Sequence, residues 1–225
     1  MKKKKTNPRK DYSISTPRFF AFSMLDVADM LRKQSCQYSR KGNLSHSSAA
    51  ASIILSYTAI ESYVNEEIQE QFEKMAPEER ENFECKEFKG EGKILRLSLR
   101  EKIVDVTSKL TGKKFPTSTN EAGWNYFVEM DEIRHKLIHY RLRRLSEEEF
   151  KQGIPGFSSE SRKDWQENFL DSITCEKSEK AIKATLRMIA ELNRIYHGQG
   201  LNSTYGFMYR DVLSNEDMAF MTKKP

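Results

Sequence analysis

The segment 134–139 concentrates residue types that can do chemistry: Arg134, His135, Lys136 and His139. A histidine has an ordinary pKa of about 6.5, so its imidazole can accept or donate a proton near neutral pH. An arginine presents a planar fork of N–H donors that matches a phosphate or a carboxylate. The combination of these types in one short stretch makes 134–139 the first candidate for a functional site.

A metal site is the competing interpretation of the same segment. Glu132, His135 and His139 recur at i, i+3 and i+7 and share one helical face, as metal ligands do. Such a site needs a further ligand, and a di-metal bundle would show a second Glu-x-x-His element. The remaining histidines, His46 and His197, lack that carboxylate spacing. The sequence therefore predicts neither a metal nor another cofactor at 134–139.

The residues around this segment predict that it lies on a helix at about 120–145. Apolar side chains recur there every three or four positions: Tyr126, Met130, Ile133, Leu137 and Tyr140. Arg134 falls at the edge of this stripe, where its guanidinium either covers apolar surface or points into a cleft between helices. At about 100° per residue, His139 lies about 140° around the helix from Arg134. Bringing both to one site requires either a distortion near the helix end or two copies that meet across a dimer axis.

A second long helix is predicted at about 47–75 by the most regular apolar stripe of the chain: Ile53, Tyr57, Ile60, Val64, Ile68 and Phe72. Glu61 and Asn65 lie at the edge of this stripe, one helical turn apart. Either their polar groups reach water, or they form a buried polar pair that orients a group on a neighbouring helix, because a buried carboxylate needs a partner. We expect Glu61 or Asn65 to approach the Arg134 region.

The remaining pattern predicts an all-α protein with four to five main helices. Further helices are expected at about 19–41, 94–111 and 175–197, with a short charged helix after Pro77. We expect one helical domain at 18–198, preceded by a flexible basic leader at 1–17 and followed by an extended tail at 199–225. The tail is apolar enough that it either packs back on the bundle or docks on a second subunit.

Composition and charge restrict the class of protein. Hydrophobic residues make up 37% of the 225 residues and charged residues 32%, and the 10 glycines and 6 prolines are too few for a strand-and-turn architecture. The net charge of +5 permits nucleic-acid binding. No apolar run approaches the ~20 residues of a membrane helix, and no apolar stretch follows the initial lysines as in a signal peptide. We therefore expect a cytoplasmic protein without membrane contact, whose Cys36, Cys85 and Cys175 are reduced thiols.

In this helical context, the motif Arg134-His135-Lys136-Leu137-Ile138-His139 resembles that of HEPN domains. These are small helical bundles marked by an arginine, four to six residues and then a histidine, often with Asn, Asp or His directly after the arginine. The stretch Trp124-Asn125-Tyr126-Phe127 lies upstream on the same predicted helix, and 59–65 lies on the earlier long helix. The resemblance covers about residues 20–197 in helix order, and its specific part is the six-residue motif.

The resemblance implies a metal-independent endoribonuclease whose site is a cleft between two protomers, with RNA as the partner. It implies His139 as the acid or base, Arg134 as the phosphate ligand and His135 as a positioning or auxiliary group. Further cations would extend the positive surface along the RNA: Lys136, Arg141, Arg143 and Arg144. Such a protein would act as a toxin or in host defence, with a cognate antitoxin or another protein as its partner. The alternative is a non-catalytic HEPN-like module that binds RNA, nucleotides or a protein.

Overall fold

The structure, a computed structural model, describes residues 19–38, 43–88, 90, 92–115, 121–139 and 172–223. These residues form helices and no strand, which confirms the predicted all-α class. The basic leader and the cations Arg141, Arg143 and Arg144 fall outside the described residues. None of the described helices combines the length and the apolar character needed to span a membrane.

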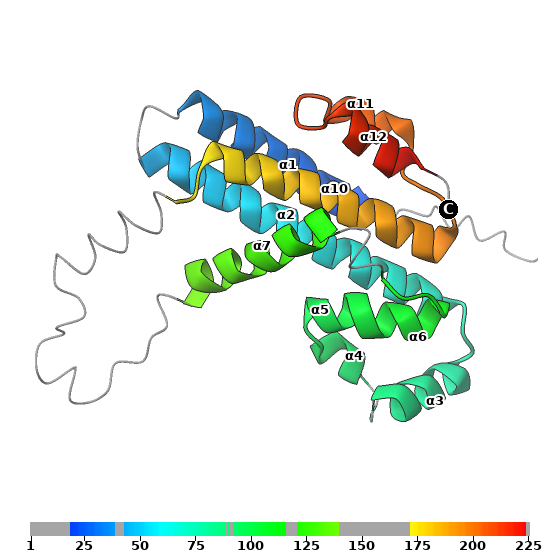
Figure 1. The fold of residues 1–225 in the computed structure, drawn as a ribbon. Coiled ribbons are helices and arrows are strands. Elements are labelled where there is room, and N and C mark those ends of the chain that lie inside the picture. Colours follow the sequence, from blue (N-terminus) through cyan, green and yellow to red (C-terminus); the bar gives the residue numbers. More distant parts are fainter. Residues whose placement is uncertain are drawn as a thin grey trace, which may run out of the picture.

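Three long helices lie side by side and form the centre of the fold: α1 (Phe19–Gln37), α2 (Asn43–Glu73) and α10 (Cys175–His197) (Figure 1). Small side chains let their backbones approach closely. Ser52 Oγ donates to the Ala28 carbonyl at 2.8 Å, and Thr185 Oγ1 donates to the Ser56 carbonyl at 3.2 Å. The buried Tyr63 hydroxyl adds a hydrogen bond from α2 to Asn193 Oδ1 on α10 at 2.9 Å. Hydrogen bonds that cross between buried helices fix their register, because an unpaired buried polar group is costly.

Helix α7 (Glu121–His139) carries the candidate motif and packs against α2 and α10. Its buried stripe includes Met130 and Ile133, as the apolar spacing predicts, and Phe127 is buried beside them. Tyr126 is only half-buried, and its hydroxyl donates to the Lys177 carbonyl in the first turn of α10 at 2.6 Å. The face of α7 toward the core is therefore rotated slightly from the predicted stripe. The phenol of Tyr126 needs a polar partner at the edge of the core, whereas the Phe127 ring needs none and is buried.

The prediction of a single continuous helix at 94–111 is wrong. After α3 (Pro77–Phe88), the chain forms α4 (Lys93–Arg96), α5 (Leu99–Glu101), the π-helical turn η1 (Lys102–Val106) and α6 (Thr107–Thr111). The break is a capping box at Ser98: its hydroxyl accepts from the Glu101 N–H at 3.3 Å, and its own N–H donates to the Glu101 carboxylate at 2.8 Å. This Ser-x-x-Glu pattern starts a new helix because it satisfies N–H groups that a helix start leaves unpaired.

The C-terminal tail packs back on the bundle. Its helices α11 (Ser203–Met208) and α12 (Asn215–Thr222) lie beside α1 and α10 (Figure 1). The Tyr205 ring stacks on Phe22 at 4.0 Å, and the Tyr209 hydroxyl donates to Asp26 at 2.6 Å. Gly200 permits the close approach, since a Cβ there would lie 2.4 Å from the Met221 carbonyl oxygen.

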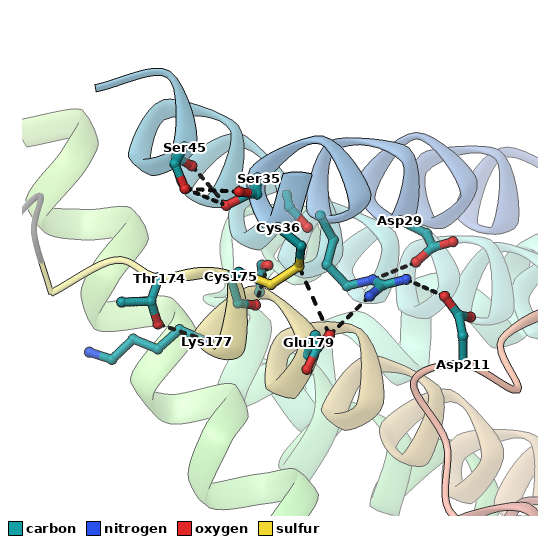
Figure 2. The surroundings of a disulfide bond; sticks show 12 residues. Asp29, Ser35, Cys36, Ser45, Thr174, Cys175, Lys177, Glu179 and Asp211 are labelled. Atoms are coloured by element: carbon teal, nitrogen blue, oxygen red, sulfur yellow. Dashed lines mark hydrogen bonds and ion pairs between the residues drawn. A yellow bond between two sulfur atoms is a disulfide. The ribbon is translucent and has the colours of Figure 1, made fainter. Parts of the chain in front are cut away.

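The end of α1 is joined to the start of α10 by a disulfide between Cys36 and Cys175 (Figure 2). The expectation of reduced thiols at these positions is therefore wrong, whereas Cys85 is a free, exposed thiol. The two cysteines are 139 residues apart in sequence, but the helix packing brings their Cα atoms to 5.1 Å, within disulfide range. Sequence spacing could not show this, because only the packing of two distant helices creates the pair.

The buried Arg32 gathers acidic groups from three segments, and Figure 2 labels these groups as Asp29, Glu179 and Asp211. Arg32 donates to Asp29 on its own helix at 2.7 Å, to Glu179 on α10 at 3.0 Å and to Asp211 in the tail at 2.5 Å. Burial of a guanidinium is tolerated when carboxylates neutralise it and satisfy its donors. Arg32 therefore ties α1, α10 and the tail together at one point.

Breaking the disulfide should destabilise the whole fold. A cross-link that closes a loop of this length restricts the unfolded chain, so Cys36→Ser or reduction with dithiothreitol should lower the free energy of unfolding by about 2–5 kcal/mol. Urea denaturation of the wild type with and without dithiothreitol measures this change. Cys85→Ser, at the exposed thiol, should leave the midpoint unchanged. Equal midpoints for the oxidised and reduced wild type would show that the sulfur atoms are not bonded.

The docking of α12 should depend on pH through Asp217. Burial by itself raises the pKa of this carboxyl, but hydrogen bonds from Lys183, Ser214 and Arg187 outweigh it and lower the pKa from 3.8 to about 2. Because the folded-state pKa is depressed, the carboxylate stabilises docking above pH 3.8, and this contribution is lost as the pH falls toward 2. Hydrogen exchange of the α12 amides, normalised to intrinsic rates, should accelerate across this interval.

Asp217→Asn should release α12 even at neutral pH, because an amide cannot replace the ion pairs with Lys183 and Arg187. Glu216→Gln is the matched control, since the neighbouring Glu216 is exposed. Equal protection of α12 in the Asp217→Asn variant and the wild type would contradict the assigned role.

Candidate active site on helix α7

Arg134 lies on the side of α7 that faces α2. Its guanidinium carbon is 4.8 Å from the centre of the Tyr57 ring, and its side chain remains 33% exposed. The nearest ion pair, from Arg134 Nη1 to Asp131 Oδ1, is long at 4.0 Å. A cation on an aromatic face is held in place while its N–H groups stay accessible. Among the residues that the structure describes, Arg134 has no closer ion-pair partner that an anion from solution would have to displace.

Tyr57 is the α2 residue that positions this arginine. Burial is the main cause that raises the pKa of its hydroxyl above the ordinary value, and the charge of Asp131 and a hydrogen bond to it act in the same direction. Tyr57 therefore remains a neutral phenol that donates to Asp131 while its ring lies under Arg134. Sequence reasoning placed Tyr57 in the apolar stripe and missed its role, because a stripe residue shows no sign of its partner on another helix.

Glu61 and Asn65, the polar residues expected near Arg134, have different surroundings. Asn65 Oδ1 accepts a hydrogen bond from the buried Lys102 ammonium at 2.9 Å, so its amide binds the first residue of η1. Glu61 is half-buried one helical turn after Tyr57, and its charge contributes to the raised pKa of the Tyr57 hydroxyl. Glu61 therefore acts on the Tyr57 hydroxyl, whereas Asn65 binds Lys102.

Three further candidate residues on α7 are exposed: Glu132, His135 and Lys136. His139 is the last residue of α7, and its side chain lies outside the described residues. Because α7 is α-helical as far as His139, positions 134 and 139 are about 140° apart around its axis. The described helix runs without a break from Arg134 to His139, and a meeting of two copies stays a prediction.

Metal-ligand residue types lie close together in two groups among the described residues. One consists of Cys36, Cys175 and Glu179, where the two sulfurs are bonded to each other. The other consists of Glu67, Glu70 and His197. Neither lies on α7, where Glu132 and His135 are exposed.

Comparisons with models of known protein families, with curated proteins and with solved structures found no match to this chain. Functional assignment therefore depends on the chemistry of α7 and of the residues packed against it. What this arrangement offers chemically is an accessible guanidinium, fixed on a buried tyrosine, on the same helix as His139.

Removing the Arg134 guanidinium should have little effect on stability. Exposed ion pairs and cation–π contacts each contribute up to about 1 kcal/mol, so Arg134→Gln, which removes one of each, should change the free energy of unfolding by no more than about 2 kcal/mol. Chemical denaturation followed by circular dichroism measures the change. Tyr57→Ala is the contrasting variant and should cost about 3 kcal/mol or more, because it leaves a cavity between α2 and α7. A loss of that size in Arg134→Gln would mean that Arg134 is a structural residue.

Proposed function

We propose that this protein is a HEPN-type, metal-independent endoribonuclease that cleaves RNA with Arg134 and His139. The observation that carries the proposal is the accessible Arg134 guanidinium on Tyr57, on the helix that also carries His139. The motif spacing and the helical bundle of α1, α2, α7 and α10 support it. In this proposal the bundle is HEPN-like, and His135 is a positioning or auxiliary group beside Arg134.

The reaction is an attack of a ribose 2′-hydroxyl on its own phosphodiester. One imidazole removes the 2′-hydroxyl proton as the 2′-oxygen–phosphorus bond forms, and a second acid donates a proton to the departing 5′-oxygen. The products are a 2′,3′-cyclic phosphate and a 5′-hydroxyl. Arg134 binds the non-bridging phosphate oxygens and stabilises the additional negative charge of the transition state. No metal is needed, because the attacking group belongs to the substrate and both proton transfers can be carried by histidines.

Two copies of the chain complete the site in this proposal. Arg134 and His139 occupy positions about 140° apart on a regular helix, so one copy does not direct both positions at a single phosphate. A homodimer in which two α7 helices meet would supply two arginines and two histidines to a shared cleft. Lys136 and the following cations, Arg141, Arg143 and Arg144, would then extend the positive surface along the RNA. A protein of this kind would act as a toxin or in host defence and be controlled by a partner such as an antitoxin.

RNA binding without cleavage is the second candidate function. Arg134 over Tyr57 is by itself a complete element for binding a phosphate, and it works without any proton transfer. Two acidic residues on the same helix, Asp131 and Glu132, limit the positive surface there. The two functions differ in whether RNA is cut, which a direct assay decides.

Cleavage of single-stranded RNA in the presence of a chelator tests the proposal. The purified full chain should give products that end in a 2′,3′-cyclic phosphate. His139→Ala should reduce the rate by about 10²–10⁴-fold, since a proton-transfer group is lost. Arg134→Ala should reduce it by about 10²–10³-fold, since charge stabilisation in the transition state is lost. Mass spectrometry of the RNA ends identifies the chemistry.

Arg96→Ala is the matched control for the loss of a positive charge, because Arg96 is exposed on α4. Its rate should equal that of the wild type. RNA that is bound but left intact by the wild type would favour the binding function. Cleavage that persists unchanged in both the Arg134 and the His139 variant would contradict the proposal.

A further inference from the structure

His197, which has no carboxylate at metal-ligand spacing in its own helix, meets one from α2. It is the last residue of α10, and its Nε2 lies 2.7 Å from Glu67 Oε2. Glu67 is 2% exposed and therefore almost completely removed from water. The pair is 130 residues apart in sequence, so only the packing of α2 along α10 creates it.

Glu70 adds a second carboxylate to this pair. It follows Glu67 by three residues on α2, and helical geometry places residues at this spacing on one face. One ligand atom from each of Glu67, Glu70 and His197 lies within 4.8 Å of the other two. Glu70 is partly exposed and forms an ion pair with Lys74 at 2.8 Å at the solvent side of the cluster. The group therefore has a buried end and an end that an ion can reach from solution.

The surroundings of the cluster favour a cation. The C-terminal end of α10 carries the negative end of the helix dipole, and the two carboxylates add formal negative charge. Lys113 already donates to the Ile195 carbonyl at 3.4 Å near this end. A buried carboxylate is stable only with a counter-charge, and a bound metal ion provides one together with direct oxygen and nitrogen bonds.

We propose that Glu67, Glu70 and His197 bind a divalent first-row transition-metal ion of the zinc class, with water as the fourth ligand. One imidazole nitrogen and two carboxylate oxygens are ligands that such ions accept at about 2.0–2.2 Å. Tetrahedral ligands at that distance are about 3.4 Å apart, so metal binding requires that the contact between His197 and Glu67 opens from 2.7 Å and that Glu70 leaves Lys74. A metal ion bound at His197 Nε2 would replace the hydrogen bond between His197 and Glu67.

This site is separate from the proposed nuclease site. Tyr57 and Glu67 are ten residues apart on α2, which is about 15 Å along the helix. The ion would fasten the end of α10 to the last two turns of α2 and would take no part in RNA cleavage. The proposal therefore does not depend on the proposed function, and cleavage in a chelator leaves it unaffected.

Titration of the full chain with Co²⁺, a zinc-class probe that absorbs visible light, tests the proposal with the disulfide intact. One Co²⁺ per chain should bind and give d–d bands without the near-ultraviolet band of a sulfur–cobalt bond, and Zn²⁺ should displace it. Glu70→Gln and His197→Gln should each weaken binding by about 100-fold or more, because a ligand is lost. Glu73→Gln is the matched control, one turn further along α2 and exposed.

Absence of Co²⁺ binding would overturn the proposal, as would affinity that is unchanged in both ligand variants. A sulfur–cobalt band would also overturn it, because the ion would then be held by cysteine. Glu70 is partly exposed, so Glu70→Gln should fold normally and keep the test valid if His197→Gln is destabilised. Circular dichroism of both variants without metal separates loss of fold from loss of a ligand.

Discussion

The close packing of α2 between α1 and α10 is the constraint on which the other features depend. Small residues at the contacts let Ser52 and Thr185 donate hydrogen bonds directly to backbone carbonyls of the neighbouring helix. Wider separation would break both bonds; Thr185 Oγ1 would keep its bond to the Ala181 carbonyl of its own helix, but Ser52 Oγ would lose its partner on α1. With α2 fixed in this way, Tyr57 lies under Arg134 and Glu67 meets His197. Both contacts therefore depend on the position of α2, the first against α7 and the second against α10.

The rest of the structure holds this packing in place from its ends. The disulfide and Arg32 join α1 to the first turn of α10, where Tyr126 of α7 also binds the backbone. Two aspartates of the tail form ion pairs with the bundle: Asp211 with Arg32 on α1, and Asp217 with Arg187 on α10. Tyr209, Leu213 and Met221 of the tail are thereby buried, whereas Phe207 and Met208 stay exposed.

The sequence predicted features that depend on neighbours along the chain. Apolar periodicity located the long helices to within a few residues, and Gly112 ends α6 with a left-handed conformation where a helix end was expected. The break at Ser98 was also readable from its Ser-x-x-Glu pattern but was missed beneath a continuous apolar stripe. Features that depend on which helices meet were not predictable. The Cys36–Cys175 disulfide and the Glu67–His197 pair join residues more than a hundred positions apart, and Tyr57 carries no sign in its own helix of the arginine that it supports.

The central claim is that α7 presents Arg134 as a phosphate ligand and His139 as a proton-transfer group. Separating these two roles requires an RNA that binds but cannot react, such as a strand with 2′-O-methyl groups at every ribose. Its dissociation constant should rise by about tenfold or more in Arg134→Gln, since a charge-assisted hydrogen bond to phosphate contributes about 1.5–3 kcal/mol. His139→Gln should bind it as tightly as the wild type. Equal affinity of the wild type and Arg134→Gln would contradict the account.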